Sequence, residues 1–226
     1  MPVMLGQAQQ LNVSRSSDGS PKQFRLLRDG TQIVVPWQQA LIFEGRGFGI
    51  HAGTVTTPLA GHSSITAIQP DVAVYFAATG TSALPIYITG TQEAGGTTLA
   101  TGGMMCAISN INVGAGTSTP VTPFNLKMTN SGGISTAAAA AQVYSGNGTD
   151  PLTAGNYLEL QRVTSLIDQD AATSGLIMNR LEWNSVGGNF SPVVEDIGSI
   201  LFYDEAAANT FFATILWAEL PSSALG

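Results

Sequence analysis

The stretch from residue 72 to residue 92, VAVYFAATGTSALPIYITGTQ, constrains the fold of this chain more than any other part. Two runs of alternating apolar residues, Val72–Phe76 and Leu84–Ile88, are separated by a break that contains Gly80. Because successive side chains of a strand point to opposite faces, each run predicts a strand with one apolar face. The short glycine-containing connection predicts an antiparallel hairpin. Pro85 lacks a backbone N–H, so its strand should begin there or be paired on one side only.

Further short apolar runs, bounded by glycine, proline and asparagine, recur along the chain with almost no helical period. They predict an all-β protein of eight to ten short strands, either a sandwich or a barrel. Pro36, between two apolar runs, permits an edge strand or a bend. The 226 residues suit one large all-β domain or two small ones. We expect residues 1–30 to form an arm and residues 31–226 to form a single domain.

Charged residues are scarce, at 10% of the chain against roughly 25% in an average globular domain. Because charge is depleted where proteins meet, this composition favours a protein that works inside an assembly. The net charge is −7, and the five basic residues among the first 46 are dispersed. They do not make the dense basic patch typical of nucleic-acid binding. No signal peptide and no apolar run of about 18 residues is visible.

The two histidines, His51 and His62, are candidate metal ligands. They lie in no H-x-H or H-E-x-x-H motif, and the sequence defines no third ligand. Two satisfied structural histidines are therefore the favoured interpretation, and a Ser-His-Asp triad is equally unsupported. Cys106 lies among apolar residues and is expected to be a buried structural thiol.

Candidate carboxylate sites are similarly incomplete. Glu195–Asp196 and Asp204–Glu205 are adjacent pairs, whose side chains point to opposite faces of a strand, whereas glycoside hydrolysis needs two facing carboxyls. Asp168 and Asp170 begin a calcium-loop spacing that stops after two ligands. The run Gly45–Gly49, GRGFG, lacks the third glycine and the helix of a dinucleotide site. We therefore predict no catalytic residue, no cofactor and no metal ligand.

The last apolar element, Thr210–Leu220, reads TFFATILWAEL and has bulky side chains on both faces. Such a strand is expected to be buried on both sides, one in the core and one under a loop or a neighbouring subunit. We assign self-association to the face that carries Phe211, Ile215 and Trp217.

Three segments carry a resemblance to viral single jelly-roll capsid proteins. Val72–Phe76, Gly80–Thr81 and Leu84–Ile88 resemble a strand, a Gly-Thr turn and an apolar-Pro-apolar strand of that family, and Phe211–Pro221, ending Trp-x-Glu-x-Pro, looks like its closing strand. The resemblance implies an antiparallel β-sandwich of jelly-roll topology that forms trimers or larger capsomers. Many of these proteins have a strongly basic N-terminal arm, which this chain lacks. Direct nucleic-acid binding is therefore not expected, and contact with an internal membrane and other virion proteins suits the chain better.

The first functional hypothesis is a capsid protein of a bacterial or archaeal virus, made in the host cytoplasm and assembled into an icosahedral-type shell. The alternative is a β-sandwich module of a phage particle that binds a carbohydrate or a receptor. Trp37, Trp183 and Trp217 could form a platform for sugar stacking, although tryptophans in alternating strands are more typical of a core or an interface. A third hypothesis is a trimeric ligand of the tumour-necrosis-factor type, which shares the jelly roll but usually carries a signal or anchor that is not visible here. An enzyme is the least favoured class.

Overall fold

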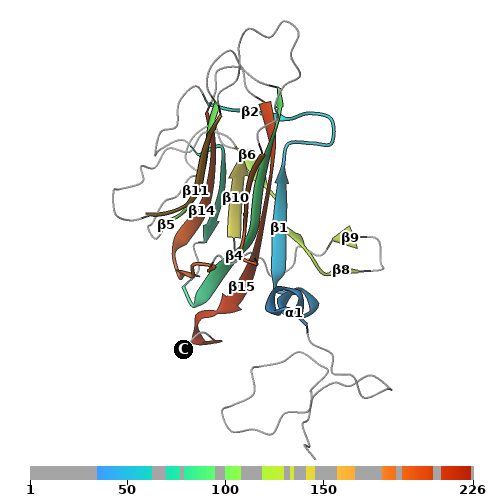
Figure 1. Ribbon diagram of the computed structural model, residues 1–226. Coiled ribbons are helices and arrows are strands. Elements are labelled where there is room, and N and C mark those ends of the chain that lie inside the picture. Colours follow the sequence, from blue (N-terminus) through green and yellow to red (C-terminus); the bar gives the residue numbers. More distant parts are fainter. Residues whose placement is uncertain are drawn as a thin grey trace, which may run out of the picture.

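The described part of the protein is an all-β sandwich of two antiparallel sheets, with one short α-helix at an end of the sheets (Figure 1). The computed structural model describes eleven segments: residues 35–62, 70–76, 79–94, 100–107, 119–129, 133–134, 141–145, 157–165, 180–186, 190–205 and 210–224. The predicted arm, residues 1–30, lies outside these segments. No helix within them has the length and apolarity needed to cross a lipid bilayer.

The first sheet has seven strands and runs in the order β12-β4-β15-β1-β7, with β13 also paired to β4 and β2 to β15. Its strands are β1 (Gly47–Ala52), β2 (Leu59–Ala60), β4 (Thr81–Ala94), β7 (Phe124–Asn125), β12 (Arg180–Asn184), β13 (Val194–Glu195) and β15 (Thr210–Pro221). The longest strand pairing in this sheet is the one between β4 and β15, which runs through its middle.

The second sheet has six strands in the order β11-β5-β14-β3-β10-β6. Its strands are β3 (Val72–Phe76), β5 (Ala100–Ala107), β6 (Thr119–Val121), β10 (Ala141–Ser145), β11 (Tyr157–Ser165) and β14 (Gly198–Glu205). The strands β8 (Met128–Thr129) and β9 (Gly133–Ile134) form a separate pair. A 3-10 turn, η1 (Ser222–Ala224), follows β15.

The strand count differs from the predicted eight to ten short strands. The described residues form fifteen strands, of which nine have five or more residues and six have only two or three. β4 and β15 are not short, with 14 and 12 residues. Four of the two- and three-residue strands are short additions to the two sheets, and β8 and β9 pair only with each other. Strands of this length show no apolar periodicity, so alternation in the sequence does not reveal them.

Eight of the longer strands pair in a nested order. The first of the eight pairs with the last, the second and third pair with the two before the last, and the two middle strands pair with each other. β1 pairs with β15, β3 with β14, β4 with β12, and β5 with β11, all antiparallel. Between β1 and β5 the chain therefore alternates between the two sheets. This arrangement corrects the predicted hairpin, because β3 and β4 lie in different sheets and do not pair with each other. The Gly80 connection carries the chain across the sandwich instead.

Pro85 has a strand partner on one side only, as its missing N–H predicts. On one side it lies opposite Trp217 of β15, next to an irregularity in the register. On the other side β13 pairs with β4 only as far as Ala83, and β12 begins its pairing at Tyr87. The proline therefore occupies the gap between these two short partners.

The core fills the space between the sheets with the inward residues of both. The largest fully buried side chains of the described residues are mostly aromatic or branched: Trp217, Tyr203, Phe48, Phe76, Phe202, Phe211, Ile50, Ile88, Met104, Ile200, Leu201 and Ile215. Two of these, Leu201 and Tyr203, alternate with the inward residues of β14 and so lie on its other face. The second sheet is thus buried on both faces along β14, as is typical of a strand with continuous apolar sequence.

The short helix α1 (Trp37–Phe43) replaces the strand or bend expected around Pro36. Proline at the position before the helix fits there because a backbone N–H is not needed. The helix ends in a Schellman arrangement, in which Gly45, at φ 76°, donates to Ile42 and Arg46 donates to the Leu41 carbonyl. Leu41 then packs with Leu220 of β15 on the outer face of the first sheet.

Asp196 ties together three segments at the end of the sandwich near the C-terminus. Its Oδ1 accepts from the Gly80 N–H at 2.6 Å and from the Ser222 hydroxyl at 3.4 Å. The Ser222 N–H in turn donates to the Gly80 carbonyl, and the Asp196 N–H donates to Thr81. Asp196 holds a φ of 58°, a left-handed conformation that aspartate and asparagine tolerate better than most residues.

We expect Asp196→Ala to lower the free energy of unfolding by about 1.5–3 kcal/mol, because it removes a charged acceptor and places alanine in the left-handed region. Asp196→Asn keeps an acceptor oxygen and tolerates the same backbone, so its loss should be less than half as large. Urea denaturation followed by circular dichroism measures both. Equal losses for the two variants would show that neither the acceptor oxygen of Asp196 nor its left-handed backbone conformation accounts for the loss of stability.

Candidate functional site

A buried polar cluster of His62, Asp71 and Asp204 lies at the end of the sandwich remote from α1. Asp71 immediately precedes β3, Asp204 lies near the end of β14, and His62 follows β2. His62 Nδ1 lies 2.6 Å from Asp71 Oδ1, and the Asp204 N–H donates to Asp71 Oδ2 over 2.6 Å. Two backbone bonds join the same segments, from the His62 N–H to the Asp204 carbonyl and from the Asp71 N–H to the Phe202 carbonyl. We call these three residues the His62 cluster.

The electrostatics of the His62 cluster favour proton binding. The hydrogen bond to Asp71 raises the pKa of His62, against the opposing effect of partial burial. Burial raises the pKa of the Asp71 carboxyl, and the bonds from His62 and the Asp204 amide oppose that rise. Tyr203, beside them on β14, has its phenol pKa raised by burial and by the Asp71 charge. The contact with Asp71 therefore favours the protonated form of the His62 ring relative to a free imidazole.

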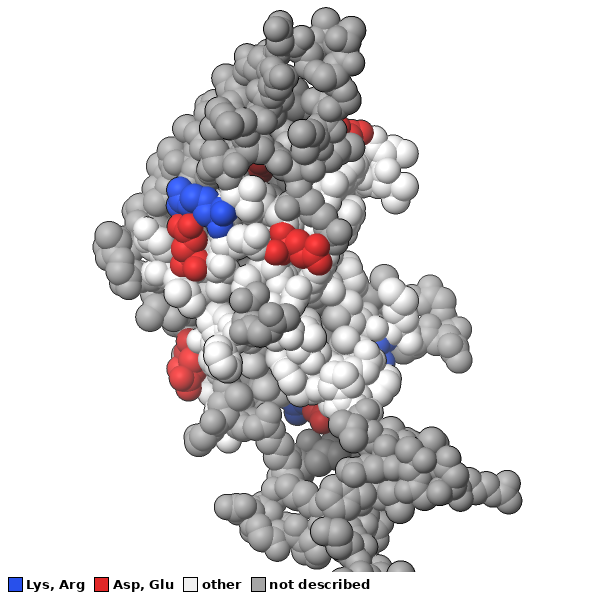
Figure 2. Space-filling model, in the orientation of Figure 1, with Lys and Arg blue, Asp and Glu red and all other residues white. Residues whose placement is uncertain are grey.

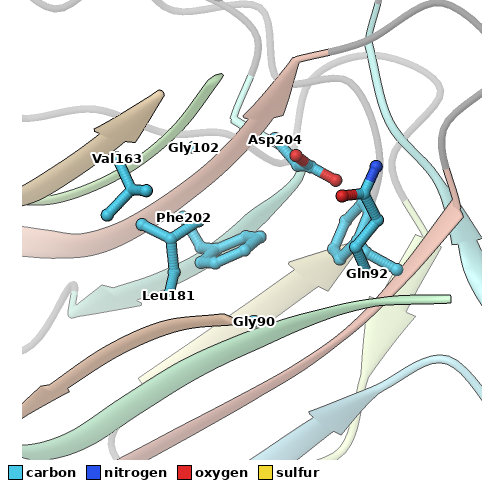
Figure 3. Close-up of a pocket in the computed structure, with 8 residues that line it drawn as sticks. Gly90, Gln92, Gly102, Val163, Leu181, Phe202 and Asp204 are labelled. Carbon is cyan, nitrogen blue, oxygen red and sulfur yellow. The ribbon is translucent and has the colours of Figure 1, made fainter. Parts of the chain in front are cut away.

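A small cavity between the sheets borders this cluster (Figure 3). In the view, the Asp204 carboxylate and the Gln92 amide point toward each other at its polar side, with Phe202 and Leu181 at its apolar side. The space is on the order of 10 Å³, which is room for about one water molecule. A cavity of this size does not hold a substrate, and its glycines, Gly90 and Gly102, mark how closely the two sheets approach each other.

The chemistry open to the His62 cluster is proton storage. Asp71 orients the His62 ring through Nδ1, while Nε2 has no hydrogen-bond partner among the described residues. No group of three or more possible metal ligands occurs in the described part of the chain. The interpretation of His62 as a satisfied histidine agrees with its contact to Asp71. These partners were missed because Asp71 is nine residues away and Asp204, whose backbone carbonyl accepts from the His62 N–H, lies on a distant strand.

The three residues assigned to self-association are in the core. Phe211, Ile215 and Trp217 are at most 1% exposed, and all belong to the cluster that fills the space between the sheets. This corrects the assignment of faces on β15, since a single chain already buries these side chains completely. The opposite face, with Phe212 and Leu216, is the half-buried one.

Other candidates from the sequence are placed in separate surroundings. Burial raises the pKa of the Cys106 thiol to about 12, which agrees with a structural thiol. His51 contacts the Thr214 hydroxyl at 3.1 Å and stacks on Phe212, on the outer face of the first sheet. Asp168 and Asp170 lie outside the described residues, as does the side chain of Glu205.

The three tryptophans do not form one platform. Trp183 and Trp217 are buried in the core, and Trp37, on α1, is 42% exposed. The Trp217 indole N–H donates to the buried Glu219 carboxylate over 3.0 Å. The hypothesis that all three tryptophans form one sugar-stacking face is therefore wrong.

Exposed apolar side chains gather on α1 and on the connection between β12 and β13. Trp37 and Phe43, at the two ends of the helix, are 42% and 59% exposed, and Phe190 is 96% exposed on the connection, which also carries Val186 and Val193. The two elements are joined by a contact of 3.4 Å from Gln38 Nε2 to Ser185 Oγ. Charged residues are few on the described surface seen in Figure 2 and lie in separate places. We call the five apolar residues Trp37, Phe43, Val186, Phe190 and Val193 the α1 surface.

Comparison of the chain with family models, with curated proteins and with solved structures finds no match.

Proposed function

We propose that this chain is a virion structural protein, a jelly-roll subunit that associates with copies of itself into an icosahedral-type shell. The nested strand pairing of the sandwich is the observation that carries the proposal. A jelly roll is a double-sheet sandwich of eight strands in two Greek keys, found in viral capsid and lectin domains. The strand orders β12-β4-β15-β1 and β11-β5-β14-β3 fit that topology, with β7, β10 and β6 added at the opposite edges.

The α1 surface supports self-association. Five apolar residues on two adjoining elements remain uncovered by the described chain: Trp37, Phe43, Val186, Phe190 and Val193. Exposed apolar groups of this kind mark sites where proteins meet, and each square ångström of apolar area removed from water contributes about 25 cal/mol. Many weak contacts repeated by symmetry can then close a shell without any single strong one. The assembly contacts proposed here use the α1 surface rather than the buried face of β15.

We expect the purified chain to form oligomers of trimer size or larger, and Phe43→Ser combined with Phe190→Ser to shift it toward monomer by tenfold or more in dissociation constant. Two exposed phenylalanines at one interface can contribute about 1.4 kcal/mol or more, which corresponds to that factor. Size-exclusion chromatography with light scattering over a concentration series gives the masses. Negative-stain electron microscopy of the same samples shows whether closed shells form.

The matched control is Val55→Ser, because Val55 is also 96% exposed but lies in the connection between β1 and β2, at the other end of the sheet from α1. This variant should assemble like the parent chain. A parent chain that stays monomeric at high concentration would reject self-assembly. Oligomers that survive the Phe43 and Phe190 substitutions but not the Val55 one would place the contact at the opposite end.

A further inference from the structure

We propose that protonation of the His62–Asp71 pair controls the attachment of residues 53–62 to the end of the sandwich, so that this segment opens more readily as the pH rises above neutral. The switch is a property of the single chain and does not depend on self-association. The segment connects β1 to the His62 cluster, and Leu59 of β2 lies opposite Phe211 of β15.

Among the described residues, few contacts hold this segment besides the pair itself and Leu59, which is partly buried against the core. β2 has only two residues, which lie opposite Thr210 and Phe211 of β15. The turn before it, residues 54–57, is closed by bonds between its own ends rather than to the sheets. The remaining described backbone bond is the one from the His62 N–H to the Asp204 carbonyl, at 3.2 Å. A segment with so few attachments is expected to open locally without unfolding the sandwich.

The pair is the strongest of these attachments. Its oxygen–nitrogen distance is 2.6 Å, and Asp71 is 2% exposed, so the interaction is shielded from solvent and salt. A charge-assisted hydrogen bond is roughly twice as strong as a neutral one. Loss of the His62 proton removes the positive charge of the donor but leaves an imidazole N–H that can donate to the buried carboxylate, which weakens the attachment without removing it.

The titratable neighbours do not reverse this effect. β14 places Tyr203 and Asp204 beside the pair, and β4 contributes the neutral Gln92 across the cavity. Tyr203 has a raised pKa, so its phenol remains neutral through the range in which His62 titrates. A negative charge on Asp204 would favour protonated His62, in the same direction as Asp71.

The sign of the pH dependence follows from the raised pKa of His62. The folded state binds a proton on His62 more tightly than the unfolded state, so this contribution is complete below about pH 6.5 and is lost as the pH rises through the folded pKa. The pair needs an ionised Asp71, and the contact with His62 lowers the pKa of that carboxyl against the effect of burial. The weakening of the attachment at higher pH is therefore assigned to His62 alone.

Hydrogen exchange measured by NMR tests the switch. Between about pH 6 and pH 8.5, the protection of the His62 amide, corrected for intrinsic exchange, should fall about tenfold for each unit by which the folded pKa of His62 exceeds 6.5. The amides of β1 should show no such fall. In Asp71→Asn, which retains an acceptor but no charge, the pH dependence of the His62 amide should disappear.

His51→Gln is the matched control, because His51 is the other histidine and contacts Thr214 rather than the cluster. It should leave the pH dependence intact and also assigns the imidazole signal of His62. A protection factor that is independent of pH in the parent chain, or equally dependent in Asp71→Asn, would overturn the proposal. If Asp71→Asn does not fold, the imidazole titration of the parent chain decides, since a His62 midpoint at or below 6.5 would also overturn it.

Discussion

Trp217→Ala should lower the free energy of unfolding by about 3–5 kcal/mol, the cost typical of removing a large aromatic side chain from a packed core. Trp217 is fully buried, and its ring lies 6.3 Å from Phe48 and 6.2 Å from Phe76, measured between ring centroids. These two aromatic neighbours come from different sheets, so the indole joins the halves of the sandwich. The substitution also removes the indole N–H that donates to the buried Glu219 carboxylate. Urea denaturation followed by circular dichroism gives the magnitude.

The neighbouring residue provides the control for this prediction. Leu216 points to the outer face of the same strand and is only half-buried, so Leu216→Ala should cost less than Trp217→Ala. If Trp217 instead formed an interface between subunits, Trp217→Ala would change the oligomer mass at a given concentration and leave the stability of the monomer nearly unchanged. That result would contradict the core position of the indole.

The two faces of β15 show what alternation in a sequence can and cannot decide. The pattern TFFATILWAEL correctly predicts a strand with apolar residues on both faces. It does not decide which face meets the opposite sheet, because both carry bulky side chains. A weaker signal was present, since Thr210 and Thr214 share their face with Phe212 and Leu216. The face with the two threonines is the outward one in the structure, and the face with Ala213 is the inward one.

The pairing of strands was less predictable than the strands themselves. Val72–Phe76 and Leu84–Ile88 are both strands, but the connection through Gly80 crosses between sheets instead of closing a hairpin. A glycine in a tight connection allows either outcome, because both need a sharp change of direction. Partners such as β14 for β3 and β15 for β4 lie more than a hundred residues away, and local sequence contains no information about them.

The helix and the His62 cluster were missed for different reasons. The helix α1 has seven residues, which is too few to establish a period, although Pro36 before it and Gly45 after it are the signals of a helix start and stop. The His62 cluster depends on Asp204, whose position is set by the β5–β14 ladder, where it lies opposite Gly102. An aspartate directly before the apolar run Val72–Phe76 was the one local sign that a buried carboxylate needed a partner.

Gly102→Ala should lower the free energy of unfolding by about 1–3 kcal/mol, as is typical when a methyl group is forced into a filled core. Gly102 lies within β5 of the second sheet, and a Cβ placed there would overlap Leu181 Cδ1 of β12 in the facing sheet. Here the absence of a side chain allows the two sheets to approach each other. Both strands are held in register by their neighbours, so the backbone has little freedom to move away.

A double-mutant cycle isolates this contact. Leu181→Ala alone should cost about 2–5 kcal/mol, because it leaves a cavity in the core. In that background the added methyl of Gly102→Ala has space, so the double variant should be more stable than the sum of the two losses predicts, by about 0.5–3 kcal/mol. Thermal and urea unfolding of the four proteins give the coupling energy. Additive losses would mean that Gly102 and Leu181 are not in contact across the sandwich, and would contradict the way in which the two sheets face each other here.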